Sequence, residues 1–151
     1  MLRTAICVLS IVATSASIGC ARAVATPRGA DPTAIEVDGE PAYVNAAGVV
    51  VPVLRFDNGP DYFVEGLART VQNGKVGFVD ENLRVVIAPA WDFAFPFENG
   101  AALVCEGCTR RRVGDEHEEV AGGRWGRIDV RGRIVVPVIH ARDAIPAAAP
   151  R

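Results

Sequence analysis

One short stretch occurs more than once in this chain, and its repetition constrains the fold more than any other feature. The clearest copy is residues 122–137, which read Gly-Gly-Arg-Trp-Gly-Arg-Ile-Asp-Val-Arg-Gly-Arg-Ile-Val-Val-Pro. The pattern predicts a short strand through Trp125, a tight turn that includes Gly132, and a second strand that ends at Pro137, which cannot donate to a sheet. The basic unit is therefore expected to be a β-hairpin.

The copies can be aligned by position. Residues 38–57 correspond without a gap to residues 73–92, which lie 35 positions later, and the third copy follows the second by 49 positions. The difference leaves an insertion of 14 residues in the second copy. We therefore predict a β domain over residues 38–145, with copies at about 38–72, 73–121 and 122–145.

The pattern within each copy indicates the fold class. Short β-rich runs alternate with turn residues, and no window has the helical period. A single unit of this size cannot bury its own apolar face, so neighbouring units must stack to form a core. The prediction is an all-β fold of strand-turn-strand units stacked into a curved sheet or a short solenoid-like array, with a charged hairpin insertion.

Glycines in the copies predict local backbone geometry. Gly48 and Gly132 occupy turn positions that require a positive φ, whereas the second copy has Leu83 there, so Asn82 is expected to take that conformation instead. Gly77 and Gly126 lie inside strands, where a missing side chain usually lets another element approach the backbone.

Aromatic and acidic side chains also recur. Core or inter-unit packing is expected for the aromatic residues Tyr43, Phe56, Phe78, Trp91, Phe97 and Trp125, and a platform that stacks carbohydrate or peptide is the alternative. The carboxylates of Asp80, Asp92 and Asp129 recur at repeat positions, which favours turn capping over an acid/base pair.

The N-terminus has the features of an export sequence. Residues 1–19 combine one Arg with an apolar run too short to cross a bilayer, which predicts a signal peptide. Cys20 follows a small residue and could be lipidated, or an ordinary signal peptidase could cleave after Ala23. Residues 20–37 are predicted to be a flexible tether and residues 146–151 a disordered tail. We therefore expect a periplasmic protein or one lipid-anchored to the cell envelope.

Charge bounds the range of partners. The whole chain has a net charge of −2, and removal of residues 1–19 with their single Arg leaves 15 basic and 18 acidic residues, a net charge of −3. Nucleic acid binding is not expected, because it requires a positive surface. Contact with a membrane is expected only through a possible N-terminal lipid.

The third copy, together with residues 89–104 before it, resembles the WG-repeat family. The units of that family read approximately G-K-W-G-[FY]-I-D-x-x-G-x-x-V-I-P, followed by F-x-x-G-L-A-x-V. The resemblance covers about residues 38–140 and includes the following signature residues: Gly77, Asp80, Trp91, Asp92, Trp125, Gly126, Asp129, Gly132 and Pro137. Only Trp125-Gly126 is a true WG pair. The resemblance implies a β-rich repeat domain of bacterial secreted and envelope proteins, and it provides no catalytic residues.

The insertion contains the only clustered reactive groups. The simplest interpretation is a hairpin that turns at Val113-Gly114, with arginines facing acidic residues across the ladder and with Cys105 and Cys108 as a disulfide or free thiols. Zinc is one alternative, because Cys105, Cys108, His117 and His140 could supply thiolate and imidazole ligands. Thiol exchange through the C-x-x-C pair is another alternative, although the helix that usually carries such a motif is not predicted.

The residue inventory argues against hydrolysis. Every serine of the chain lies in residues 1–19, so the mature chain could not hold a Ser-His-Asp triad. The sequence therefore favours a non-catalytic exported domain without a cofactor, which acts as a binding or scaffold module for an unknown protein or envelope ligand. A small thiol or zinc protein is the alternative.

Overall fold

A computed structural model describes residues 31–113 and 117–146. Twelve strands and one short 3₁₀ helix, η1 (Arg142–Ala144), make up this part of the chain. The strands are β1 (Thr33–Val37), β2 (Glu40–Val44), β3 (Val50–Pro52), β4 (Arg55–Phe56), β5 (Gly59–Pro60), β6 (Leu67–Gln72), β7 (Lys75–Asp80), β8 (Val85–Trp91), β9 (Phe93–Glu98), β10 (Ala101–Val113), β11 (His117–Asp129) and β12 (Ile134–His140). In the described ranges, no helix is long and apolar enough to cross a membrane.

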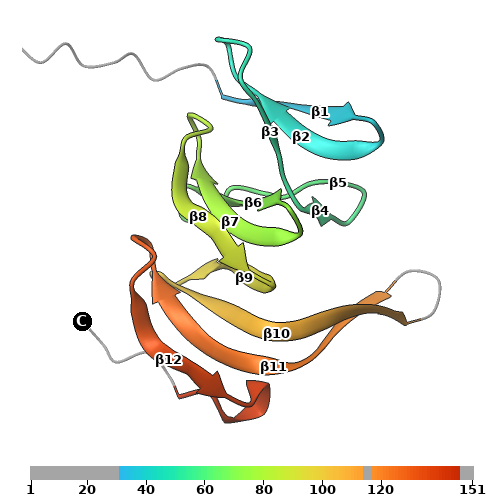
Figure 1. Cartoon of the computed structure of the whole chain (residues 1–151). Coiled ribbons are helices and arrows are strands. Elements are labelled where there is room, and N and C mark those ends of the chain that lie inside the picture. The colour runs from blue at the N-terminus through green and yellow to red at the C-terminus, as the bar shows by residue number, and fades with distance from the viewer. Residues whose placement is uncertain (1–30, 114–116, 147–151) are drawn as a thin grey trace, which may run out of the picture.

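The strands form three tiers that follow one another along the chain (Figure 1). The first sheet has the order β1-β2-β3, the second β6-β7-β8, and the third β12-β11-β10-β9, while β4 and β5 form a small hairpin between the first two. All pairings within these sheets are antiparallel. The predicted all-β repeat fold is therefore confirmed.

The second and third sheets each combine the end of one sequence copy with the start of the next. Strand β6 closes the first copy, yet it pairs with β7 of the second copy from Leu67↔Asp80 to Gln72↔Lys75. Strand β10 of the second copy likewise pairs with β11, most of which belongs to the third copy. The first two copies are therefore not independent units, because each supplies a strand to the sheet that follows it.

The first sheet shows that the predicted tether ends too late. The tether is predicted over residues 20–37, but Thr33–Val37 form β1, which pairs with β2. The Asp38-Gly39 turn, with φ of 53° and 81°, closes this hairpin in the conformation that Asp-Gly turns favour. Strand β1 thus takes the edge of the first sheet that β6 takes in the second.

The same turn follows the middle strand of every tier. In each turn an Asn or Asp side chain, at position 45, 80 or 129, accepts hydrogen bonds through Oδ1 from the backbone N–H groups two and four residues later. The backbone carbonyl of the same residue accepts from the N–H three residues later. This shared geometry is the structural basis of the sequence repeat.

The second of these turns corrects one prediction. Leu83 itself has a φ of 62°, so the positive φ does not move to Asn82. A leucine in this conformation costs roughly 1–2 kcal/mol. Leu83 is only 5% exposed and packs in a cluster with Tyr43 and Val53 of the first tier, which offsets that cost.

Gly77 and Gly126 mark close approaches of neighbouring backbones. A Cβ on Gly77 would lie 2.6 Å from the Pro89 nitrogen of β8, and a Cβ on Gly126 would lie 2.5 Å from the Val136 carbonyl oxygen of β12. The β7–β8 and β11–β12 ladders both shift register at these glycines. The predicted close approach is therefore real, and the approaching group is the backbone of the next strand.

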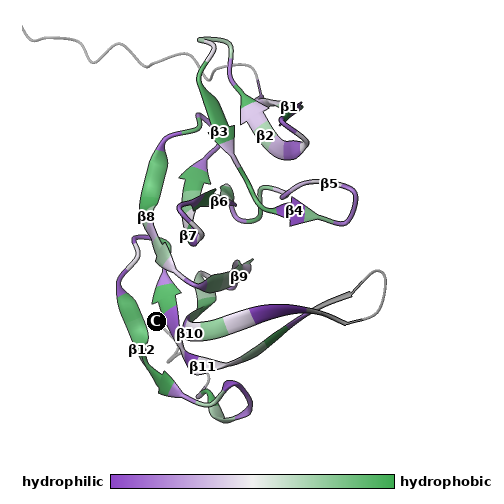
Figure 2. Ribbon diagram, turned by 45° about the vertical axis from the view of Figure 1, so that its right-hand side comes forward, coloured by the Kyte–Doolittle hydropathy of each residue, from purple (hydrophilic) through white to green (hydrophobic). Residues whose placement is uncertain are grey.

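The main core joins the second and third tiers. Phe78 and Phe97 meet edge to face with ring centroids 4.8 Å apart, and Ile128 packs in the same cluster. The prediction that Phe56 packs in the core is wrong. This residue lies in β4, is 41% exposed, and contacts Tyr62, which follows β5. Apolar side chains also remain exposed on β8 and β12, namely those of Val85, Val86, Ile134, Val135 and Ile139. Both strands are largely green, the colour of hydrophobic residues, in Figure 2.

Candidate functional site

The insertion is a long hairpin made of the outer halves of β10 and β11. The two strands pair in register from Thr109↔Ala121 to Val113↔His117. Arg111 donates to Glu119 across the ladder at 2.8 Å, with both side chains largely exposed. The predicted charged hairpin is therefore confirmed, while its turn at residue 114 lies outside the described residues.

A break in the ladder and a disulfide lie where this hairpin leaves the sheet. Glu106 pairs with Arg124 and Cys108 with Gly122, which leaves Gly107 and Gly123 outside the register. The register of the repeats aligns Gly122-Gly123 with the Asn73-Gly74 turn of the second tier, and all four residues have a positive φ. The third tier thus keeps the conformation of that turn but continues outward as a hairpin.

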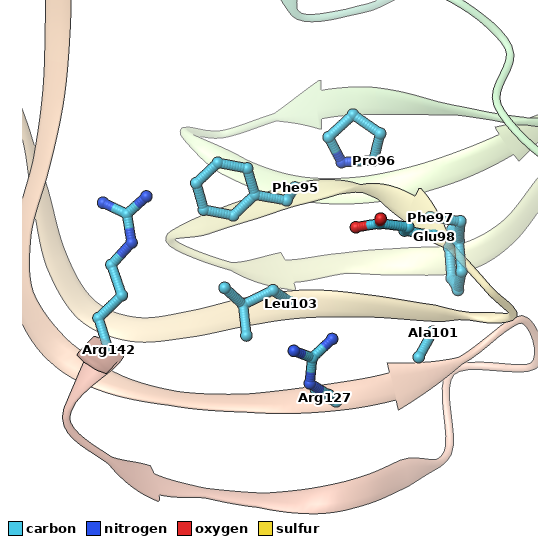
Figure 3. A pocket seen from close by; sticks show the side chains of 8 residues that line it. All are labelled: Phe95, Pro96, Phe97, Glu98, Ala101, Leu103, Arg127 and Arg142. Atoms are coloured by element: carbon cyan, nitrogen blue, oxygen red, sulfur yellow. The ribbon is translucent and has the colours of Figure 1, made fainter. Parts of the chain in front are cut away.

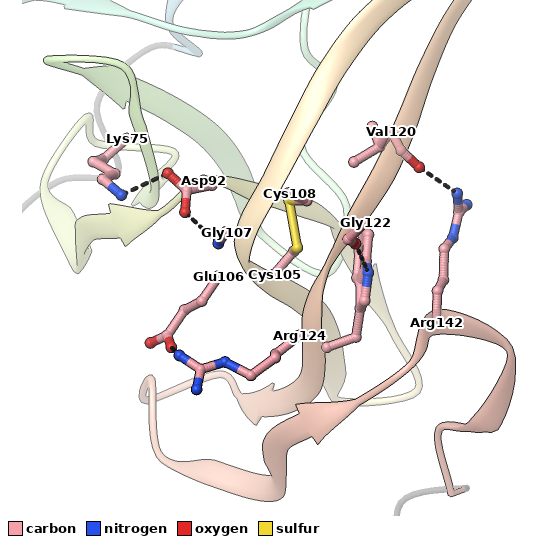
Figure 4. Close-up of a disulfide and its surroundings, with 11 residues drawn as sticks. Lys75, Asp92, Cys105, Glu106, Gly107, Cys108, Val120, Gly122, Arg124 and Arg142 are labelled. Carbon is pink, nitrogen blue, oxygen red and sulfur yellow. Dashed lines mark hydrogen bonds and ion pairs between the residues drawn. A yellow bond between two sulfur atoms is a disulfide. The ribbon is translucent and has the colours of Figure 1, made fainter.

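Cys105 and Cys108 form a disulfide within β10, with their Cα atoms 6.1 Å apart (Figure 4). Both are buried, at 0% and 9% exposure, and they pack with Trp125 in a small apolar cluster. Gly123 belongs to the same arrangement, since a Cβ there would lie 2.6 Å from the Cys105 Sγ. The sulfur atoms are therefore part of the packing at the base of the hairpin.

Asp92 connects this break in the ladder to the second tier. Its carboxylate accepts from Lys75 Nζ at 2.6 Å and from the Gly107 N–H at 2.7 Å (Figure 4). The hydrogen bond from Lys75 contributes most to holding the pKa of Asp92 below its ordinary value, and the hydrogen bond from Gly107 contributes next. The prediction that Asp92 caps a turn is wrong, because its side chain bridges two tiers instead.

The four residues considered for zinc do not come together. Cys105 lies opposite Trp125, whereas His117 lies opposite Val113, eight positions further along β10. At about 3.3 Å per residue this separates the two ends by roughly 26 Å. His140 lies on the other side of Trp125, in β12. The described residues contain no group of three or more potential metal ligands, and the two thiols are joined to each other, so this set does not fit a zinc site.

Asp80 and Asp129 occupy the repeated turns rather than a shared site. Asp129 is 1% exposed and also accepts from Arg133 Nε at 2.7 Å. Burial raises the pKa of Asp129, but hydrogen bonds from the Arg133 backbone and side chain and from the Arg131 N–H outweigh it and lower the pKa to about 2. Both carboxylates therefore serve as hydrogen-bond acceptors in turns.

The remaining signature residues also have structural positions. Trp125 is 1% exposed, and its indole Nε1 donates to the Gly122 carbonyl at 2.9 Å. Trp91 is buried in the core between the second and third tiers. Pro137 lies in β12 at the edge of the third sheet, where a missing N–H is tolerated. None of these residues points to a ligand site.

A pocket of about 460 Å³ lies between β9, β10, β11 and η1 (Figure 3), and we name it the β9–η1 pocket. Its apolar lining consists of Phe95, Pro96, Phe97, Ala101 and Leu103. Its charged lining consists of Glu98, Arg127 and Arg142. Sequence reasoning missed this site, because its residues are spread over positions 95–142. Phe97 and Ala101 belong to the repeat pattern, but that pattern predicts packing and gives no sign of a pocket.

The two arginines of the pocket differ in how they are held. Arg142 lies over the rings of Phe95 and Trp125, with its guanidinium carbon 4.9 Å and 5.3 Å from their centroids, and it donates to the Val120 carbonyl at 3.4 Å. Arg127 lines the pocket from β11, and its Nε atom is buried without a hydrogen-bond partner among the described residues. Arg127 thus presents a cation whose hydrogen-bonding capacity the fold does not use.

The lining of the β9–η1 pocket contains groups of two kinds. The pocket combines guanidinium donors with an aromatic and aliphatic wall, which suits the binding of a small amphipathic group. Cys20, the residue considered for lipidation, lies outside the described residues.

Comparison with known proteins identifies one part of the chain. Residues 77–107 match the family model of the WG containing repeat, from the middle of β7 to Gly107 in β10. Searches of curated proteins and of solved structures gave no significant match. The matched segment includes Gly77, the residue on which the backbone of β8 packs. Residues 77–107, which run from the second sheet into the third, are therefore similar to the WG containing repeat.

Proposed function

We propose that this protein is a non-catalytic binding module of the bacterial cell envelope, exported by residues 1–19 and retained in the periplasm or anchored through a lipid on Cys20. Its partner would be a protein or a smaller envelope ligand. The stacked sheets would act as the scaffold, and the β9–η1 pocket as the recognition site.

The observation that carries this proposal is the buried, unpartnered Nε of Arg127 beside an apolar pocket wall. A buried polar group without a partner costs about 1–3 kcal/mol, so its presence in a native structure calls for an explanation, and a ligand that supplies the acceptor is one. The other charged side chains with low exposure, such as Asp61 and Arg69, satisfy one another inside the fold. The pocket is thus the place where hydrogen-bonding capacity remains for a ligand.

A fragment screen by NMR tests the binding role. The ¹⁵N-labelled protein is titrated with a library of small amphipathic compounds, and shifts are mapped on the described residues. We expect the hits to cluster on Leu103, Arg127 and Arg142. An absence of hits, or hits scattered over all three tiers, would contradict the proposal.

Mass spectrometry of the protein isolated from a bacterial envelope tests the location. A lipid mass on Cys20 indicates anchoring, and cleavage near Ala23 indicates release to the periplasm. Recovery of the chain with residues 1–19 intact in the cytoplasmic fraction would overturn the export proposal.

The alternative is a thiol protein that acts through Cys105 and Cys108, and the observed disulfide is the feature that favours it. Both sulfur-bearing residues are buried, however, and exchange requires attack by an accessible thiolate. Alkylation under native conditions with a mild reductant separates the two roles. The binding proposal expects the disulfide to persist, whereas rapid labelling of both cysteines would favour thiol exchange.

A further inference from the structure

We infer that the β9–η1 pocket binds a monocarboxylate carried on an aromatic or branched aliphatic body. This inference rests on the binding role proposed above and specifies the chemical class of the ligand. It derives from the balance of charge in the pocket, from the hydrogen-bonding state of Arg127, and from the apolar wall.

The charges in the pocket favour a single negative charge. Arg127 and Arg142 contribute two positive charges, and Glu98 contributes one negative charge from the same lining (Figure 3). No ion pair within the described residues involves any of these three side chains. The pocket thus has a net charge of about +1, which a monoanion balances and a dianion exceeds.

The geometry of the donors favours a carboxylate. A guanidinium presents its N–H groups in a planar fork that matches the two oxygens of a carboxylate. The Nε of Arg127 is one arm of such a fork, and it has no acceptor among residues 31–113 and 117–146. Because this Nε is buried, a ligand carboxylate would reach it once the Arg127 side chain rotates toward the pocket.

The apolar part of the lining favours an apolar body. Phe95, Pro96 and Leu103 line the same pocket as the two arginines. Phe95 is already fixed by the guanidinium of Arg142 over its ring and by an edge-to-face contact with Phe93, whose centroid is 5.0 Å away. The pocket of about 460 Å³ is of the size that binds small ligands.

The test uses matched acid and amide probes on the ¹⁵N-labelled protein. Phenylacetate is compared with phenylacetamide, which has the same ring and no charge. A short peptide ending in phenylalanine is compared in the same way with its C-terminal amide. The side-chain Nε–H resonance of Arg127 and the backbone resonances of Leu103 and Arg127 report on the pocket directly.

We expect each acid to shift these resonances and to bind at least about tenfold more tightly than its amide, since hydrogen bonds to charged groups are the stronger ones. Arg127→Gln should remove most of this preference. Arg124→Gln is the matched control, because Arg124 lies on the same strand but pairs with Glu106 outside the pocket. Tighter binding of the peptide than of phenylacetate would identify a chain end as the source of the carboxylate, and the reverse would identify a free organic acid.

The possible failures are distinct. If the amides shift the pocket resonances as strongly as the acids, or if Arg127→Gln leaves the preference intact, the carboxylate inference is overturned and the pocket remains a binding site. If no probe shifts any pocket resonance while the spectrum remains that of the folded protein, both the inference and the proposed binding role are contradicted.

Discussion

The guanidinium of Arg69 forms a bidentate ion pair with the buried carboxylate of Asp61, with NH2 2.5 Å from Oδ1 and Nε 3.0 Å from Oδ2. The two side chains are only 6% and 3% exposed. Arg69 also donates to the Ala94 carbonyl of β9 at 3.0 Å, and the Asp61 carbonyl accepts from the Tyr43 hydroxyl of β2 at 2.9 Å. Asp61 and Arg69, through their ion pair and these two hydrogen bonds, therefore connect all three tiers.

Removal of one partner of this pair should be among the most damaging single changes. We expect Asp61→Ala or Arg69→Ala to lower the free energy of unfolding by about 3–5 kcal/mol, because the remaining charge stays buried without its partner. Urea unfolding followed by circular dichroism measures this. Arg55→Ala is the control, since Arg55 and Glu36 form an exposed pair worth about 0–1 kcal/mol. Equal effects of the two arginine variants would contradict the assigned role.

The glycines of the WG-type strands should not tolerate a methyl group. We expect Gly77→Ala and Gly126→Ala each to destabilise the protein by about 1–3 kcal/mol, because the new Cβ would overlap the backbone of β8 or β12. Gly59→Ala is the control, because a Cβ there meets nothing within 4 Å. Thermal unfolding of the three variants decides the point, and an intact Gly126→Ala protein would argue against the close approach.

The three repeated turns show how far the sequence determines the fold. The turn residues Asn45, Asp80 and Asp129 are recognisable from spacing alone, because each must supply an acceptor at a fixed position. The conformation of Leu83 is not recognisable in this way, because tertiary packing with Tyr43 stabilises a backbone that leucine avoids. Local propensity is a good guide only where the decisive contacts are local.

The site was less accessible to sequence reasoning than the fold. The C-x-x-C pair attracts attention as chemistry, yet both cysteines are buried in packing around Trp125. Arg127 and Arg142 look like ordinary surface residues in the sequence, and only the pairing of β11 with β12 and the position of η1 bring them into one pocket. A site assembled from several elements leaves no periodic pattern.

Acid should weaken the third turn in a defined range of pH. The folded pKa of Asp129 is about 2, below the unfolded value of about 3.9. Its ionised form therefore stabilises the fold above about pH 4, and that contribution is lost as the pH falls from about 4 to about 2. We expect Asp129→Asn to show a smaller loss of stability over this range than the wild type, as followed by thermal unfolding at several pH values.

The first tier provides a matched test of this explanation. Asn45 occupies the equivalent turn and accepts the same two backbone hydrogen bonds without a charge. Asn45→Asp should therefore add acid sensitivity to a turn that lacks it. If Asp129→Asn and the wild type lose stability in parallel between pH 4 and pH 2, the role assigned to the Asp129 carboxylate is wrong.

At Leu83 the strained backbone conformation destabilises the fold, whereas the buried side chain stabilises it. Leu83→Gly should relieve roughly 1–2 kcal/mol of strain, but it removes a buried side chain whose truncation typically costs about 2–5 kcal/mol. We therefore expect a net loss of stability, measured by urea unfolding. Asn82→Gly, at the exposed neighbouring position, should cost no more than about 1 kcal/mol. A stabilised Leu83→Gly variant would mean that packing against the first tier contributes little.

The measurement that most directly tests the stacked-repeat architecture is NMR spectroscopy of its three turns. We expect a positive φ at Gly48, Leu83 and Gly132, near 79°, 62° and 77°. We also expect slow hydrogen exchange of the amides four residues after Asn45, Asp80 and Asp129. A negative φ at Leu83, or rapid exchange of these amides in any one tier while the others are protected, would contradict the stacked-repeat architecture.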